Sequence, residues 1–293
     1  MLRSVERAAA TMADGALSYV RSPDLPYFEE PPVREVSVVI QFQALPLRAV
    51  DLGDLRDRLR GRYPTVHERP PAPSQVENFR SSLNSQLRVQ FTLADRVPIP
   101  MLIFVSEDES SIIQVQSDRF ACAWRRTETV KYPRYERIRE ETVRLLELFS
   151  EFVEAACDGE DIKVTQAEVA YVNTIPVGDQ GRPDVLANAV PDHARDTTLP
   201  VISSTIASYS LTFQNANKVE YARLHMKGEP DLEASEPTVL LTLLYRGEPY
   251  ERSSEPPGLD TLLAFVDEGH EQIVRAFAQN TTPDAQRLWR RIV

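Results

Sequence analysis

The chain has few of the residues that mark several common kinds of protein. Only 10 of its 293 residues are glycine, and neither a G-x-x-x-x-G-K-[ST] nor a G-x-G-x-x-G motif occurs, so no glycine-rich loop is available to cradle a phosphate. There are two cysteines and four histidines, no two at metal-ligand spacing, and there is no H-E-x-x-H or G-x-S-x-G motif. The sequence therefore predicts no bound metal, no cofactor and no familiar hydrolase or phosphate-transfer chemistry.

Positive charge and long hydrophobic runs are also scarce. The net charge is −11, and only 4 of the 33 basic residues are lysine. Because non-specific binding to nucleic acid or anionic lipid requires positive surface, we expect neither partner. No run approaches the roughly 18 apolar residues of a membrane-spanning helix, and charges interrupt the Ala-rich start, so we expect no membrane association and a cytoplasmic protein. Buried free thiols at Cys122 and Cys157 would fit that compartment.

What the chain does have is the composition of a globular protein, with 42% hydrophobic and 26% charged residues. Residues 1–30 are interpreted as an N-terminal extension, because prolines after residue 22 end any regular structure. Residues 31–158 and 159–293 each show a strand, a connection, three strands and a long helix. We therefore predict an α+β fold of two similar halves, each an antiparallel sheet covered by one long helix, of TATA-binding-protein-like or helix-grip type. The two layers could form one continuous sheet.

Hydrophobic periodicity predicts the individual elements. In the first half we expect a strand at 36–42, a helix at 52–59 with Asp51 as its N-cap, a loop at 65–80, strands at 87–93, 101–105 and 113–124, and a helix at about 132–156. In the second half we expect strands at 169–175, 209–213, 219–226 and 239–245, a polar connection at about 177–200, and a helix at 259–277.

A histidine interrupts the apolar stripe of the last long helix. Leu259, Leu263, Val266, His270, Ile273 and Phe277 step by 4, 3, 4, 3 and 4 residues, which keeps them on one helix face. In a functional interpretation His270 is a general acid or base, or a pH switch. In a structural interpretation it packs on the sheet and is held by a carbonyl or carboxylate, such as Asp267 three residues earlier. We favour the structural interpretation.

Two further patterns have both a functional and a structural interpretation. The segment from Ser117 to Arg126 combines aromatic rings with arginines, as surfaces that stack single-stranded bases do. We favour a strand with Phe120, Cys122 and Trp124 on one face. Asp161 to Lys163 and Glu128 to Lys131 match fragments of magnesium-dependent nuclease sites, but we favour simple strand-entry turns.

Several segments together resemble a family of uncharacterised bacterial proteins of similar length with a sporadic distribution. The resemblance covers residues 31–293 and rests on Pro31–Val36, Gln114–Phe120 with Trp124 and Arg125, Tyr132–Glu136, Tyr171–Ile175, and the tail with His270, Phe277, Thr281 and Trp289. The family has no assigned activity. Its patchy distribution implies mobile genes, as in phage-defence or toxin–antitoxin systems. Members often have asparagine before the tryptophan, where this chain has Ala123.

Three hypotheses about function follow. We favour a non-catalytic binding or scaffold protein that acts through a protein partner or by self-association, at a sheet edge or sheet face. The second is a helix-grip pocket for a small apolar ligand, and the third is a nuclease-like enzyme. We predict no catalytic residue. The candidate binding residues are His270, Asn173, Tyr171, Trp124 and Arg125.

Overall fold

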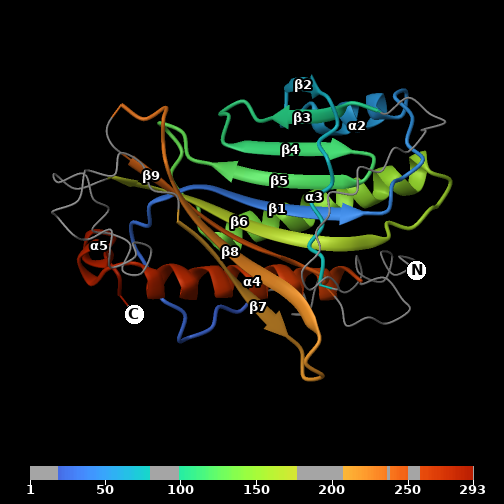
Figure 1. Cartoon of the computed structure of the whole chain (residues 1–293). Coiled ribbons are helices and arrows are strands. Elements are labelled where there is room, and N and C mark those ends of the chain that lie inside the picture. Colours follow the sequence, from blue (N-terminus) through green and yellow to red (C-terminus); the bar gives the residue numbers. More distant parts are fainter. Residues whose placement is uncertain (1–18, 80–98, 177–206, 236–237, 250–257, 293) are drawn as a thin grey trace.

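The fold is α+β, with one large antiparallel sheet and a few helices (Figure 1). The computed structural model describes residues 19–79, 99–176, 207–235, 238–249 and 258–292. Nine strands lie in the order β2-β3-β4-β5-β1-β6-β9-β8-β7. The strands are β1 (Val33–Phe42), β2 (Thr65–Arg69), β3 (Met101–Val105), β4 (Ser111–Gln116), β5 (Arg119–Arg125), β6 (Val164–Pro176), β7 (Ala207–Gln214), β8 (Glu220–Pro230) and β9 (Thr238–Gly247). The helices are α2 (Leu52–Leu59), α3 (Tyr135–Ala156), α4 (Leu259–Asn280) and α5 (Pro283–Leu288).

Alternating side chains give the sheet one apolar face. In β1, Val36, Val38 and Ile40 are at most 2% exposed, whereas Ser37 and Val39 between them are only half-buried. The same alternation runs through the neighbouring strands, because side chains of paired residues point to the same side of a sheet. The core therefore lies on one side of the sheet.

The two long helices, α3 and α4, both cover this apolar face. The ring of Phe149 on α3 lies 4.8 Å from that of Phe120 on β5, and the ring of Phe265 on α4 lies 5.1 Å from that of Tyr245 on β9. The helices are joined to each other by Arg139 of α3, whose Nε donates to Asp267 of α4 at 2.8 Å. The opposite face of the sheet, here called the open face, carries the more polar side chains that alternate with the buried ones.

Most of the predicted elements are confirmed. The expected strands at 36–42, 101–105, 169–175, 209–213, 219–226 and 239–245 and the expected helices at 52–59, 132–156 and 259–277 all coincide with observed elements. The strand expected at 87–93 and the connection at about 177–200 lie outside the described residues. Of the N-terminal extension, residues 19–30 are described, and Leu25 and Phe28 within it are buried.

Three local predictions were wrong. The single strand expected at 113–124 is two strands, β4 and β5, joined by a tight turn at Ser117 and Asp118, which are residue types that favour turns. Residues 65–69 form β2 instead of a loop, because they pair with β3. Asp51 does not cap α2 with its side chain; its carboxylate accepts from the backbone N–H of Arg48 at 2.8 Å instead.

Candidate functional site

Four polar side chains form a line across one end of the open face. In the strand register Gln116 of β4 pairs with Arg119 of β5, Arg119 with Gln41 of β1, and Gln41 with Gln166 of β6. All four therefore project from the face opposite to the helices. We call Gln116, Gln41 and Gln166 the glutamine row.

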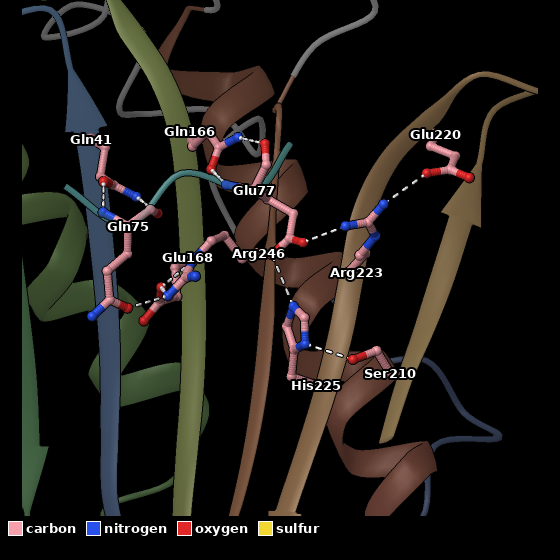
Figure 2. Close-up of polar contacts among 10 residues, drawn as sticks. All are labelled: Gln41, Gln75, Glu77, Gln166, Glu168, Ser210, Glu220, Arg223, His225 and Arg246. Carbon is pink, nitrogen blue, oxygen red and sulfur yellow. Dashed lines mark hydrogen bonds and ion pairs between the residues drawn. The ribbon is translucent and has the colours of Figure 1, made fainter. Parts of the chain in front are cut away.

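An extended segment of the chain lies across this row. Residues 70–79, here called the strap, follow β2 and cross the strands of the sheet (Figure 1). The side-chain amide of Gln41 binds both main-chain groups of one strap residue, Gln75. Its Nε2 donates to the Gln75 carbonyl at 2.8 Å, and its Oε1 accepts from the Gln75 N–H at 3.1 Å (Figure 2).

The other two glutamines repeat this arrangement. Gln116 donates to the carbonyl of Ala72 at 3.0 Å and accepts from its N–H at 3.1 Å. Gln166 donates to the carbonyl of Glu77 at 2.7 Å and accepts from its N–H at 2.7 Å. An amide that offers one donor and one acceptor to a single residue copies what a neighbouring β-strand offers. The glutamine row thus binds an extended main chain without reading its side chains.

The strap is also held through the carboxylate of Glu77. Glu77 accepts from Arg223 Nη1 at 2.6 Å, and its other oxygen lies 2.9 Å from His225 Nε2 (Figure 2). His225 Nδ1 lies 2.7 Å from the hydroxyl of Ser210 on β7. The hydrogen bond with His225, together with that from Arg223, outweighs the opposing effect of burial and lowers the pKa of Glu77 to about 2. We call Arg223 and His225 the carboxylate clamp.

Arginines bind the strap at two further points. Arg119 Nη2 donates to the carbonyl of Pro73 at 2.8 Å. Arg246 of β9 donates to the side chain of Gln75 at 2.8 Å and to Glu168 at 2.6 Å, and the Arg246 and Glu168 side chains are both largely buried (Figure 2). The guanidinium of Arg246 is therefore fixed in place by the sheet as well as by the strap.

On the other face of the sheet, three of the predicted binding residues meet at a small cavity. The cavity has a volume of about 80 Å³, and Tyr171, Asn173 and His270 contribute to its lining. The Tyr171 hydroxyl lies 2.7 Å from Nδ1 of His270, and the imidazole stacks on Tyr135 with the ring centroids 3.8 Å apart. This volume would hold about two or three waters, whereas pockets for drug-sized ligands usually exceed about 300 Å³.

His270 is a buried neutral ring in this arrangement. Burial, assisted by the charges of Arg21 and Arg275, lowers its pKa to about 3. The expectation that Asp267 holds His270 is wrong, because the Asp267 carboxylate instead accepts from the hydroxyl of Tyr135 at 2.6 Å and from Arg139. The hydroxyl of Tyr171 takes that place.

The remaining two predicted residues lie on opposite sides of the sheet. Trp124 belongs to the helix-covered face, where its ring lies 5.4 Å from that of Tyr132, whose hydroxyl is 3.4 Å from that of Tyr171. Arg125 projects from the open face, and its Nε donates to the carbonyl of Glu109 at 2.8 Å. The structure thus brings Tyr171, Asn173 and His270 together, places Trp124 beyond Tyr132 on the same face, and leaves Arg125 apart.

Sequence reasoning did not find the glutamine row, the strap or the carboxylate clamp. One weak signal existed, since Gln41, Gln116 and Gln166 each occupy a polar position of an alternating strand. The prolines at 70, 71 and 73 marked the strap as non-regular but not as bound.

Within the described ranges, no group of three or more His, Cys, Asp or Glu side chains is placed to hold a metal ion. None of the helices in those ranges is long and apolar enough to cross a membrane. The two carboxylate–lysine patterns lie in the connections before α3 and before β6.

In comparisons with known proteins, no family model and no curated protein matches the sequence.

Proposed function

We propose that this chain is a non-catalytic binding protein that acts through a protein partner, and that an extended segment of this partner binds on the open face. The observation that carries the proposal is the glutamine row, in which Gln116, Gln41 and Gln166 each bind both main-chain groups of one residue in an extended segment. Such main-chain pairing gives affinity in strand-addition complexes of proteins with peptides.

The nature of the strap contacts supports exchange of the bound segment. None of the strap residues belongs to the apolar core, and most of the strap is exposed. Its contacts are hydrogen bonds, ion pairs and the packing of Arg223 over the Phe79 ring. The neutral hydrogen bonds contribute only about 1 kcal/mol each, because water can replace them, and those to the Glu77 carboxylate about 1.5–3 kcal/mol each. A segment held in this way can leave without disturbing the core.

We further propose that the sheet consists of two related halves of TATA-binding-protein-like type. The order β1-β5-β4-β3 with α3 and the order β6-β9-β8-β7 with α4 support this, because the two series meet at the β1–β6 pair. Helices on one face leave the other face to the strap and, when the strap is displaced, to a partner. Membership of the sporadic bacterial family, with a role in a mobile or phage-defence system, is part of the same proposal.

The test is co-purification from the native host with a tagged wild-type chain and a variant carrying Gln41→Ala, Gln116→Ala and Gln166→Ala. We expect one protein to co-purify stoichiometrically with the wild type and to be lost with the variant. The control is Arg137→Ala on α3, whose side chain is exposed and pairs only weakly with Glu140. It should retain the partner.

Other outcomes would favour the other hypotheses. A small molecule released on denaturation, with no protein bound, would support the apolar-ligand hypothesis. Recovery of a second, untagged copy of the chain would make the partner a homo-oligomer. A protein that all three chains retain equally would place the binding surface away from the open face.

A further inference from the structure

We propose that the open face selects an extended peptide that carries a carboxylate, and that the strap is the chain's own occupant of this site. The inference rests on the proposed function and names the chemical class of the ligand. The site consists of the glutamine row, which binds the main chain, and the carboxylate clamp of Arg223 and His225. The preferred peptide has a Glu two residues after the residue bound by Gln41.

Selectivity for an acid must come from the clamp, because the row binds only main chain and the contacts of Arg246 with Gln75 and of Asp118 with Ser74 involve neutral strap side chains. Glu77 is the strap residue whose main chain and carboxylate are both bound, by Gln166 and by the clamp. Arg223 and His225 approach different oxygens of this carboxylate. A pair of donors directed at two oxygens matches the geometry of a carboxylate and not that of an apolar side chain.

Neighbouring side chains orient the two residues of the clamp. Arg223 keeps an ion pair with Glu220 at 3.1 Å, and Ser210 orients the other nitrogen of His225. A neutral side chain in place of Glu77 would leave these partly buried donors without their strongest acceptor. Sites of this kind reject an analogue that lacks the matching group more strongly than apolar pockets do.

The strap then has a regulatory consequence. As a covalently attached segment it competes with any external peptide at an effective concentration of about millimolar. A partner segment must therefore bind more tightly than the strap or act when the strap is displaced. The wild-type chain should bind an isolated peptide of the same sequence only weakly.

The test uses a full-length variant in which residues 71–79 are replaced by nine Gly and Ser residues. The probe is a fluorescein-labelled peptide with the sequence of residues 71–79, PAPSQVENF. We expect the linker variant to bind this peptide, measured by fluorescence anisotropy, at least tenfold more tightly than the wild type does. A peptide with the change Glu77→Gln should bind the linker variant at least tenfold more weakly.

Further variants assign the discrimination to the clamp. In the linker variant, Arg223→Ala with His225→Ala should remove the difference between the two peptides. Lys227→Ala is the matched control, because Lys227 follows His225 on the same face of β8 and pairs with Glu229. It should keep the difference. Equal binding of both peptides to the linker variant, or no binding by a variant with the wild-type thermal transition, would overturn the inference.

A second measurement covers the case in which the linker variant does not fold. In the otherwise unchanged chain, Glu77→Gln should increase the hydrogen-exchange rates of the Gln75 and Glu77 amides at least tenfold, whereas Lys227→Ala should not. Unchanged exchange would contradict the inference.

The outcome is separable from that of the proposed function. A host partner that survives loss of the clamp but not of the glutamine row would overturn this inference alone. Selective peptide binding without any host partner would overturn only the proposed function.

Discussion

His270 combines burial, stacking and a polar contact with the hydroxyl of Tyr171. Its ring is 6% exposed, stacks on Tyr135 and contacts the hydroxyl of Tyr171. These contacts favour the neutral ring, because a charged imidazole would be separated from water. The histidine in the helical stripe is therefore a packing residue with a pH-dependent contribution to stability. Sequence reasoning could predict its burial from periodicity, but not its partner, which comes from β6.

The first prediction is that His270 makes the chain acid-sensitive. Its folded-state pKa, about 3, lies below the ordinary 6.5, so the unfolded chain takes up a proton first. The contribution is complete above pH 6.5 and is lost as the pH falls towards 3, by at most about 1.4 kcal/mol per pH unit. His270→Phe should cost about 1–2 kcal/mol at pH 8, and the deficit should shrink at pH 5.

Urea unfolding at pH 8, 6 and 5 gives the free energy of unfolding of the wild type and of His270→Phe. Ile273→Val on the same helix is the control, since Ile273 is equally buried and does not titrate. Its deficit, about 1 kcal/mol, should be constant with pH. A constant deficit for His270→Phe as well would show that His270 is not the acid-sensitive group.

At the scale of elements, one buried ion pair joins the two long helices. Arg139 of α3 donates to both carboxylate oxygens of Asp267 on α4, at 2.8 and 3.1 Å, and both side chains are mostly buried. Removing one partner of such a pair leaves a charge with too few hydrogen bonds in a poorly solvated place. The intact pair therefore mainly orients the two helices. Loss of one partner should lower the free energy of unfolding.

The second prediction compares two arginines of the same helix. Arg139→Ala should lower the free energy of unfolding by roughly 3 kcal/mol, because Asp267 stays behind without its charged partner. Arg137→Ala should change it by less than about 1 kcal/mol, because its pair with Glu140 is exposed. Urea unfolding at neutral pH measures both. If the two variants lost similar amounts of unfolding free energy, the ion pair between Arg139 and Asp267 would not be a major contributor to stability.

The third prediction concerns the strap. Gln41→Ala removes both hydrogen bonds to the main chain of Gln75, so the Gln75 amide should exchange its hydrogen at least tenfold faster. Global stability should fall by only about 1–2 kcal/mol, since no core side chain loses a contact. Gln114→Ala is the control, because Gln114 lies on the same face of β4 as Gln116 but outside the row. If both variants left the Gln75 amide equally protected, the row would not be what holds the strap.

The sequence predicted those elements that have one buried face and one exposed face. Strands such as β1 and β9, with one buried face, show the two-residue period, and α3 and α4 show the helical one. The strand β2 is almost wholly exposed, so it has no such period. The glutamine row could not be predicted, because its members come from three strands and become neighbours only through the register of β4, β5, β1 and β6.

At the scale of the whole molecule, the seam between the predicted halves is part of the core. Val38 of β1 is 1% exposed and pairs with Cys122 of β5 and with Val169 of β6. The buried apolar residues of both halves form one cluster across this seam. Residues 31–158 and 159–293 therefore share a single hydrophobic core, even though each contributes its own strands and long helix.

A shared core predicts that both halves unfold together. The chain has two tryptophans, and these can report separately, because Trp124 lies on β5 and Trp289 packs against Phe277 of α4. Trp124→Phe and Trp289→Phe each leave one fluorophore. Within each variant, urea curves from tryptophan fluorescence and from circular dichroism should have the same midpoint. Leu243→Ala on β9, which should cost about 2–5 kcal/mol, should lower the Trp124 midpoint as much as the Trp289 midpoint. A Trp124 signal that ignored this change in β9 would instead mean that the two halves fold as separate domains.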